Sequence, residues 1–412
     1  MISRRSLLEA AAVLTGARFT APRWLVTPDE AKAQGLNLSP DLPEGARGEA
    51  VLDALPGKKP LIKLTYRPPN YETPVEYLRT DVTPNDAFFV RYHLSDIPDV
   101  DAKTWQLAIG GDGANGETRL GLDDLKQLPP TEVVAVCQCA GNRRGLMQPH
   151  VIGVEWGNGA MGCARWKGVR LKDLLDRVGL KRETVEIVLD GADSGASDKT
   201  PDFVKSIPLW KALDESTLVA YEMNGEPLPH WNGFPARVVV PGWAGTYWMK
   251  HVTSIMAVTK PFEGFWMKSA YRIPLGKFPV VARFSSQETT ANAPITDILV
   301  NSLITSHSDG ARVKVGAAVT VAGIAWDAGY GINEVDVSSD GGQTWTAAML
   351  GENHGPFALR AWRLQFAAQV PGRHVIMVRA INRIGQSQAM VLTPNPAGYH
   401  HNLVQAVTLV AA

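Results

Sequence analysis

The sequence predicts an α+β protein: a mixed α/β domain followed by an all-β sandwich of the immunoglobulin type. Between about residues 80 and 285, strand-like apolar runs alternate with helical segments that are too few and too irregular for a regular βαβ series. From about residue 295 onward, apolar and polar residues alternate with a period of two, and glycine-rich turns interrupt this alternation at regular spacing. These two observations define the fold class.

Individual segments of the first domain fit this description. Residues 171–179 (LKDLLDRVG) have the apolar spacing of a short helix, whereas residues 185–194 and 236–243 are typical of strands. The glycine-rich stretch 110–117 (GGDGANGE) has no helical pattern after it, so we interpret it as a hairpin loop rather than a phosphate-binding loop. Residues 34–75 are rich in proline, glycine and aspartate and predict an extended arm that wraps around the domain.

Composition limits the classes of function. The 412 residues contain 41 Lys+Arg and 41 Asp+Glu, so no overall positive field attracts nucleic acid or an anionic membrane, and we expect no nucleic-acid partner. Three cysteines are a small and odd number, which argues against a disulfide framework. The sequence also contains no CxxCH motif, the attachment site of a c-type haem. We therefore expect no c-type haem attached to this chain.

The first 33 residues have the pattern of an export signal. A pair of arginines (SRRS) precedes an Ala/Leu/Val run that is too short to span a bilayer, which fits the twin-arginine route to the periplasm. Ala31-Lys32-Ala33 offers a cleavage site, and a basic helix that stays attached is the alternative. The expected organisation is a signal peptide at 1–33, a first domain at 34–290 and a sandwich domain at 291–412, with no membrane span.

The stretch 134–145 (VAVCQCAGNRRG) places thiols and two arginines at the end of an apolar strand. Cys139 follows the strand directly and precedes a glycine turn, so we expect its side chain in a crevice. The arginines should lower the pKa of this thiol and favour the thiolate, the form that binds metal. Cys137 lies on the same face of the strand, and a small buried apolar role is the alternative for any single thiol. We expect that role for Cys163.

Two further stretches carry positive charge. In residues 88–94 (FFVRYHL), the alternation places Arg91 and His93 on the same side of a strand. In residues 229–250 (PHWNGFPARVVVPGWAGTYWMK), Arg237 and Lys250 lie around glycine turns next to tryptophans. Taken alone, each of these two stretches is interpreted as a strand or loop with a solvated charge.

Taken together and in order, these stretches resemble the sulfite oxidase family of molybdenum enzymes over nearly the whole chain after the predicted signal. The matching motifs are FFVRYH, CAGNRR, EWGNGAMGCARWKGVRLKDLL, AYEMNGEPLP, NGFPARVVVPG and DGGQTW. With a twin-arginine signal and no haem motif, the chain is most similar to the bacterial periplasmic sulfite dehydrogenases of this family.

The resemblance implies a molybdenum ion held by the dithiolene of one molybdopterin and by the thiolate of Cys139, a soft ligand that suits this metal. It implies that Arg91 and Arg144 bind the substrate oxyanion, because guanidinium groups match such oxyanions well. It also implies that Trp156 forms a wall of the pocket and that Tyr271 hydrogen-bonds an oxygen of the metal centre. The residues expected to contact the cofactor are Phe89, Val90, Arg91, Tyr92, His93, Cys139, Asp193, Asn232, Arg237, Trp248, Met249 and Lys250.

Two regions depart from the animal members of the family. Asn232 stands where those enzymes have a histidine, which preserves a hydrogen bond to the cofactor but changes its pH response. Near the C-terminus, His400 and His401 lie in the region from which the animal enzymes supply a further substrate-binding arginine. The resemblance therefore leaves substrate affinity and its pH dependence open.

The activity implied by the resemblance is the oxidation of sulfite to sulfate by oxygen-atom transfer. A separate cytochrome c, either a subunit or a soluble protein, would take the electrons. The sandwich is expected to form either a homodimer or a heterodimer with a cytochrome. One alternative is a periplasmic reductase of the same fold that acts on oxidised methionine, although such enzymes lack the sandwich. The other is a non-catalytic exported binding protein, against which the intact Cys139, Arg91 and Tyr271 argue.

Overall fold

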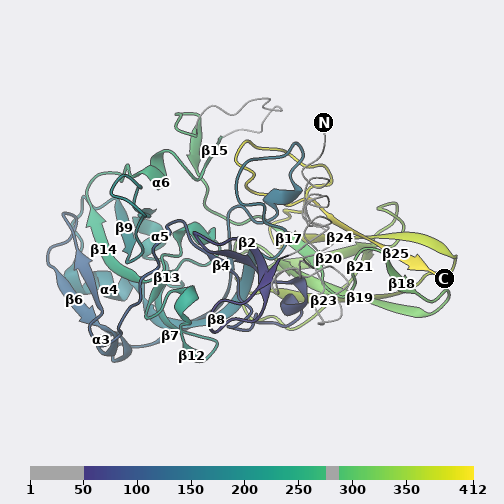
Figure 1. Cartoon of the computed structure of the whole chain (residues 1–412), viewed down its shortest axis with the longest axis horizontal. Coiled ribbons are helices and arrows are strands. Elements are labelled where there is room, and N and C mark those ends of the chain that lie inside the picture. Colours follow the sequence, from purple (N-terminus) through teal and green to yellow (C-terminus); the bar gives the residue numbers. More distant parts are fainter. Residues whose placement is uncertain (1–50, 275–286) are drawn as a thin grey trace, which may run out of the picture.

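The computed structural model describes residues 51–274 and 287–412, so the predicted signal peptide lies outside the described residues. The molecule is elongated, with the first domain at one end and the sandwich at the other (Figure 1). Strands outnumber helices in both parts, and the α+β fold class with a C-terminal sandwich is confirmed. None of the helices in the described ranges has the length and apolar character needed to cross a bilayer.

Two five-stranded sheets form most of the first domain. One has the order β10-β9-β14-β5-β6, in which β14 pairs with β5 in parallel and the other pairs are antiparallel. Its strands are β5 (Gln106–Gly110), β6 (Thr118–Gly121), β9 (Glu186–Gly191), β10 (Lys205–Pro208) and β14 (Val252–Val258). The other sheet consists of β7 (Thr131–Gln138), β8 (Met161–Arg170), β11 (Leu218–Met223), β12 (Glu226–Pro227) and β13 (Arg237–Val239). The predicted loop at 110–117 joins β5 to β6 as a hairpin, as expected.

Helices in the described residues are short. The predicted helix at 171–179 is α4 (Leu171–Val178), which buries Leu171, Leu174, Leu175 and Val178 at helical spacing. It ends at Gly179, whose φ of 64° is readily adopted by glycine. The other α-helices are α3 (Leu122–Lys126), α5 (Leu209–Ala212) and α6 (Phe265–Lys268). The 3₁₀ helices are η1 (Val75–Leu78), η2 (Arg144–Leu146), η3 (His230–Asn232) and η4 (Gly245–Tyr247).

The expectation of an extended arm up to residue 75 is wrong for the part that the structure describes. Instead, β1 (Leu52–Asp53), β2 (Leu61–Thr65) and β3 (Asn70–Glu72) form an antiparallel sheet with β4 (Val90–Arg91). The cause is that each strand has at most five residues, too few to show alternation among the turn-forming residues. This sheet carries β4, and with it Arg91, on its edge.

The C-terminal sandwich consists of a four-stranded and a five-stranded sheet. The first contains β17 (Asn301–Ile304), β19 (Ala318–Trp326), β22 (Met349–Leu350) and β23 (Arg360–Ala367). The second contains β18 (Ala311–Val313), β20 (Ile332–Ser338), β21 (Thr346–Ala347), β24 (Gly372–Asn382) and β25 (Gln405–Ala411). Apolar side chains of both sheets, among them Val321, Val335 and Val378, form a core between them.

The two domains are joined by a shared core. Buried Leu303, Trp326 and Leu359 of the sandwich side pack in the same apolar cluster as the core of the first domain. The pair β15 (Arg272–Pro274) and β16 (Asn292–Pro294) lies on the connection between the domains. The exact boundaries at 290 and 291 stay a prediction.

Candidate active site and cofactor pocket

Cys139 directly follows β7 in a tight turn that hydrogen bonds hold in place. Its backbone N–H donates to the carbonyl of Ala160 at 2.9 Å, and its carbonyl accepts from the N–H of Asn142 at 2.9 Å. The side chain of Asn142 in turn accepts from the N–H of Ala160 at 3.0 Å. A Cβ at Gly141 would lie 2.5 Å from the guanidinium of Arg144, so glycine leaves the room that this side chain occupies. Cys139 is 7 % exposed and lines a cavity.

The two arginines that follow this turn diverge. Arg143 has a φ of 66° and donates to Asn301 Oδ1 at 2.9 Å and to the carbonyl of Leu403 at 3.0 Å, both in the C-terminal domain. Arg144 lies in the wall of the cavity that contains Cys139. The expectation that both arginines act on the thiol is therefore wrong for Arg143, which serves the domain junction instead.

A cavity of about 900 Å³ opens beside Cys139 between the two domains. Its walls include Arg91, Arg144, Tyr271 and, from the segment before β25, Tyr399. Arg144 donates to the carbonyl of Ala397 at 3.0 Å and lies 5.2 Å from the centre of the Tyr399 ring. The structure thus brings the metal-ligand candidate and both predicted oxyanion-binding arginines to one cavity.

Tyr271 also lines this cavity, and its hydroxyl forms a hydrogen bond with His93. The imidazole of His93 stacks on Phe203 with ring centres 3.7 Å apart. Burial lowers the pKa of His93, and the positive charges of Arg91, Lys250 and Lys205 lower it further, so the ring stays neutral. Burial also raises the pKa of Tyr271, which keeps its hydroxyl protonated at neutral pH.

A second, narrower cavity of about 40 Å³ shares Arg91, Cys139 and Tyr271 with the first. Most of the residues predicted to contact the cofactor line it: Phe89, Arg91, His93, Cys139, Asn232, Arg237, Trp248 and Lys250. They lie in or next to β4, η3, β13 and η4 and in the turn after β7. Segments that are distant in the sequence therefore form the wall of this cavity together.

The charged side chains that line this second cavity are all positive, and the carboxyl of Asp193, which does not line it, acts on Lys250. Within residues 51–274 and 287–412, Arg91, Arg237 and Lys250 form no ion pair with a carboxylate. Burial lowers the pKa of Lys250 to about 8, and buried Arg237 has an Nε atom without a hydrogen-bond partner. Buried cations are costly unless an opposite charge accompanies them. The residues present therefore fit an anionic group such as a phosphorylated pterin.

The remaining predicted cofactor residues line neither cavity. Val90 and Tyr92 pack in a separate apolar cluster, and the Tyr92 hydroxyl lies 2.7 Å from His251 Nε2. Asp193 and Met249 are buried, and burial raises the pKa of Asp193. A contact between these four residues and the cofactor stays a prediction.

Three residues near the proposed substrate site also lie away from the cavity walls. Trp156 is fully buried, meets Phe89 edge-on at 6.5 Å and has an indole N–H without a partner. His400 and His401 are buried at the domain junction, where burial lowers their pKa values to about 4 and about 3. Neither histidine lines the cavity, whereas their neighbour Tyr399 does.

Sequence reasoning missed several residues of the site. Lys205 is fully buried, lies 5.1 Å from the centre of the Tyr271 ring and donates to the carbonyl of Trp266 at 2.7 Å. Burial lowers the pKa of Lys205 to about 7. Tyr399, Phe203 and Thr246 also line the cavities. No motif marks these residues, and only the charge at position 205 within an apolar strand gives a signal.

Comparison with known proteins assigns both domains. Residues 93–266 match the oxidoreductase molybdopterin binding domain, and residues 292–408 match the Mo-co oxidoreductase dimerisation domain. Sulfite oxidase of Gallus gallus is 35 % identical over 82 % of this chain and 72 % of its own length. Sulfite oxidase of Arabidopsis thaliana is 35 % identical over 74 % of this chain and 79 % of its own length. The chain belongs to the sulfite oxidase family. Its cofactor is molybdenum bound to molybdopterin.

Other relatives define how far the similarity extends. Mitochondrial sulfite oxidase of Macaca fascicularis is 39 % identical over 77 % of this chain, and the match spans 58 % of that protein. Among solved structures, the sulfane dehydrogenase SoxCD of Paracoccus pantotrophus superposes with a TM-score of 0.72 at 28 % identity. The superposition covers 84 % of this chain and 86 % of that one. The family fold thus extends over both domains.

Proposed function

We propose that this chain oxidises sulfite to sulfate in the periplasm and passes the electrons to a cytochrome c. One observation carries the proposal. The thiol of Cys139, the guanidinium groups of Arg91 and Arg144, and the hydroxyl of Tyr271 share a single cavity. A metal ligand next to paired guanidiniums is suited to a small oxyanion that reacts at the metal.

In this proposal, the bound molybdenum cofactor supplies oxygen-atom transfer and accepts two electrons. Arg144 holds the oxyanion from the side of the C-terminal domain, because Ala397 and Tyr399 fix its guanidinium at the cavity wall. Arg91 binds from the opposite side, where the edge of the N-terminal sheet places it between both cavities. Tyr271 keeps a protonated hydroxyl next to the neutral imidazole of His93. In the tautomer in which His93 Nε2–H donates to this hydroxyl, the phenol proton offers a hydrogen bond to substrate oxygen.

The periplasmic location is supported by the paired arginines and the short apolar run at the start of the sequence. The choice of cytochrome c rests on the resemblance to the bacterial periplasmic sulfite dehydrogenases. Because this sequence contains no CxxCH motif, the c-type haem of that acceptor would belong to another protein. The C-terminal domain, which matches a dimerisation domain, is the proposed docking element for a second copy or for the cytochrome.

The lining of the cavity favours a second candidate substrate, because its walls include apolar Val151, Ile152 and Trp266. Because a solved relative is a sulfane dehydrogenase, oxidation of sulfane sulfur on a larger carrier is the alternative within the same chemistry.

The test uses the purified protein with cytochrome c as the acceptor. We expect sulfite to reduce cytochrome c and to yield an equal amount of sulfate, with one molybdenum per chain. Faster turnover of a small-molecule persulfide than of sulfite would favour the sulfane alternative. Reduction of methionine sulfoxide by a reduced dye, without sulfite oxidation, would identify a reductase. A chain without molybdenum would be a binding protein.

A further inference from the structure

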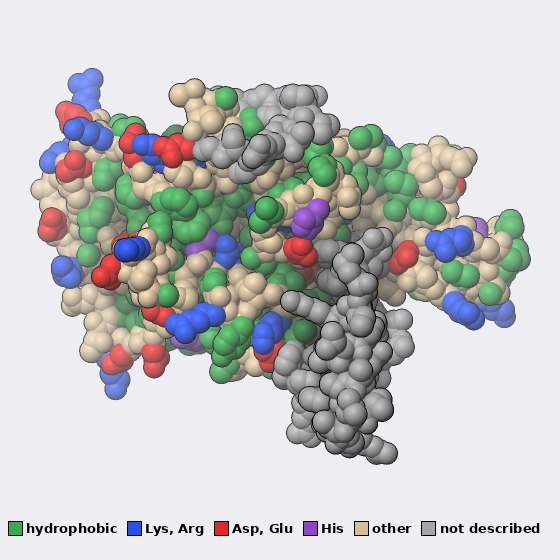
Figure 2. Space-filling view, turned by 45° about the horizontal axis from the view of Figure 1, so that its top comes forward, with side chains coloured by type: hydrophobic (Ala, Val, Ile, Leu, Met, Phe, Trp, Pro, Cys, Tyr) green, Lys and Arg blue, Asp and Glu red, His purple; other side chains and the backbone are tan. Residues whose placement is uncertain are grey.

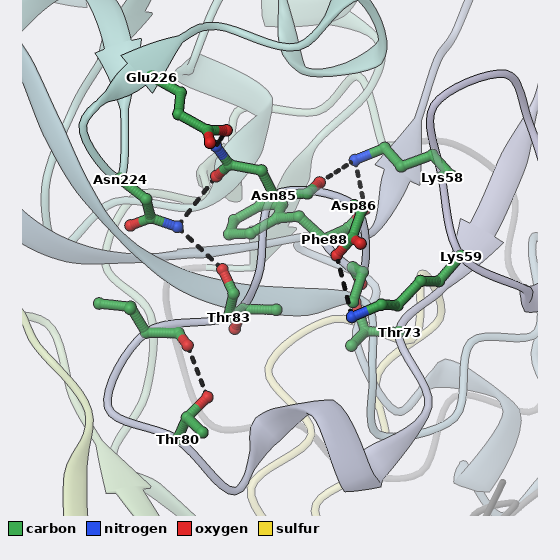
Figure 3. A network of polar contacts seen from close by, with 12 residues as sticks. Lys58, Lys59, Thr73, Thr80, Thr83, Asn85, Asp86, Phe88, Asn224 and Glu226 are labelled. Atoms are coloured by element: carbon green, nitrogen blue, oxygen red, sulfur yellow. Dashed lines mark hydrogen bonds and ion pairs between the residues drawn. The ribbon is translucent and has the colours of Figure 1, made fainter. Parts of the chain in front are cut away.

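Lys58 is a buried cation that neither family domain includes. It lies between β1 and β2, is 8 % exposed and donates to three acceptors. Its Nζ atom lies 2.6 Å from the carbonyl of Asn85, 3.1 Å from that of Phe88 and 2.6 Å from Asn232 Oδ1. Figure 3 shows Lys58 directed toward the turn that contains Asn85 and Phe88. Within the ranges that the structure describes, Lys58 forms no ion pair with a carboxylate.

This arrangement determines how the side chain of Asn232 is oriented. An ammonium group only donates hydrogen bonds, so the oxygen of the Asn232 amide must face Lys58. Its NH₂ group therefore turns toward the carbonyl of Phe89, 3.3 Å away, and toward the second cavity, which Asn232 lines. Without Lys58, this orientation would depend on the longer contact with the Phe89 carbonyl alone.

Lys58 also fixes the backbone that leads into β4. Its bonds to the carbonyls of Asn85 and Phe88 hold the turn directly before Phe89 and Arg91. Asn224 donates to the side chain of Asn85 at 2.9 Å and supports the same turn (Figure 3). The lysine thus connects the turn before β4 with Asn232, which lies 174 residues after Lys58 in the chain.

We propose that Lys58 is a positioning residue for molybdopterin. It turns the NH₂ group of Asn232 toward acceptor atoms of the pterin and adds a positive charge behind a pocket that already contains Arg91, Arg237 and Lys250. The inference rests on molybdopterin binding and not on the choice of sulfite as substrate.

The electrostatics of Lys58 support this role. Burial lowers the pKa of Lys58 to about 7, so the ammonium group holds its proton weakly unless an anion lies nearby. An anion bound in the neighbouring cavity stabilises the charged form, and Lys58 in turn favours the bound anion.

The experiment compares Lys58→Met with Lys59→Met in the cofactor-loaded protein. Lys59 is the matched control, because it is the next residue, is solvent-exposed and pairs with Asp86 at 3.4 Å. We expect Lys58→Met to release molybdopterin about tenfold faster, as is typical when a residue behind a ligand is removed. Release is followed by pterin fluorescence, and Lys59→Met should release it at the wild-type rate.

A purely structural role is distinguished by comparing loaded and cofactor-free protein. In our proposal, Lys58→Met reduces the increase in Tm that the cofactor produces. The proposal would be overturned if Lys58→Met lowered the Tm equally in the loaded and the cofactor-free protein and left the rate of molybdopterin release unchanged. If Lys58→Met does not fold, Lys58→Gln takes its place. Its amide still donates to Asn232 but carries no charge, so release should be slower than from Asn232→Ala, and release as fast as from Asn232→Ala would contradict the proposal.

A double-mutant cycle tests the route through Asn232. Asn232→Ala should also accelerate release, and adding Lys58→Met to it should change the rate little further, because both substitutions remove the same contact. Fully additive effects would show that Lys58 does not act through Asn232. These outcomes do not depend on sulfite turnover, so failure of the proposed substrate would leave them intact.

Discussion

The three cysteines differ in what surrounds their sulfur atoms. Burial raises the pKa of Cys137 to about 11 and that of Cys163 to about 12, so both thiols stay protonated at neutral pH. A Cβ at Gly245 would lie 3.2 Å from the sulfur of Cys137. The backbone of Gly245 therefore leaves little room for a metal at this sulfur. Cys139 alone of the three lines both cavities.

The first prediction separates these two neighbouring thiols. Cys139→Ser should abolish turnover and leave the fold intact, because the hydrogen bonds of the turn involve its backbone and not its sulfur. Cys137→Ser should retain turnover and lose about 1–2 kcal/mol of stability, the usual effect of a buried substitution. Activity and urea denaturation of both variants provide the check, and an inactive Cys137→Ser with an active Cys139→Ser would reverse the assignment.

The second prediction concerns the oxyanion. Arg91→Gln should raise the KM for sulfite about tenfold or more, because a charge-assisted hydrogen bond in a desolvated site is worth about 1.5–3 kcal/mol. Asn70 Oδ1 already accepts from this guanidinium at 3.2 Å, so the glutamine amide can keep the local contact. Steady-state kinetics across sulfite concentration test the prediction, and an unchanged KM would restrict Arg91 to the cofactor.

For single residues, the sequence predicted which functional groups form the site, but it did not predict which groups each side chain contacts. Thiol, guanidinium and phenol were identified from motifs, and the structure brings them to one cavity. Arg143 and Arg144 look equivalent in the sequence, yet one reaches the C-terminal domain and the other the cavity. Lys58 and Lys205 could not be predicted, because their roles depend on contacts with residues distant in the chain.

At the scale of elements, the segment before β25 connects the site to the domain junction. It presents Tyr399 to the cavity and buries His400 and His401 behind it. The long strands of the sandwich and helix α4 were predictable, because their apolar residues repeat with a clear period. Strands β1–β4 were not, because each has five residues or fewer and depends on its neighbours.

The third prediction follows from the buried histidine. His401 has a pKa of about 3 in the folded protein, lowered by burial and by Arg143, against 6.5 ordinarily. The unfolded chain therefore binds more protons between these values, so stability falls as the pH drops below 6.5. From pH 7 to pH 5 the wild type should lose about 2 kcal/mol more than His401→Gln. Urea denaturation at both pH values measures this difference, and parallel losses would contradict the prediction.

At the scale of the whole molecule, the sandwich supports β7, the strand that leads to the proposed metal ligand Cys139. The indole N–H of Trp326 donates to Gln138 Oε1 at 2.6 Å, one residue before Cys139. The N–H of Val136 donates to the carbonyl of Phe357 at 2.9 Å. The active-site strand is thus anchored by the second domain, which no pattern within either domain could have predicted.

The fourth prediction tests this anchoring with two buried tryptophans of the same sheet. Trp326→Phe removes the bond to Gln138, whereas Trp362→Phe removes an indole whose N–H has no partner among the residues that the structure describes. Both substitutions lose the packing of the larger ring. Trp326→Phe should lose about 1–3 kcal/mol more stability than Trp362→Phe, because it leaves a buried acceptor unpaired. It should also lower molybdenum content, which Trp362→Phe should not. Equal effects in both variants would show that the contact does not support the site.

The last prediction concerns how electrons leave the molecule. Lys and Arg side chains are interspersed with Asp and Glu on the face in Figure 2, in line with equal totals of 41 each, so attraction to a cytochrome depends on a local patch. Sulfite should reduce the isolated protein by two electrons and then stall until cytochrome c or ferricyanide is added. Turnover with cytochrome c should fall as salt is added, because exposed charges are screened over about 10 Å at 0.1 M salt. Oxygen should be a poor acceptor. Stopped-flow absorbance with sulfite alone tests the stall, and rapid formation of peroxide from sulfite in air without cytochrome would place the enzyme among oxidases that use oxygen directly.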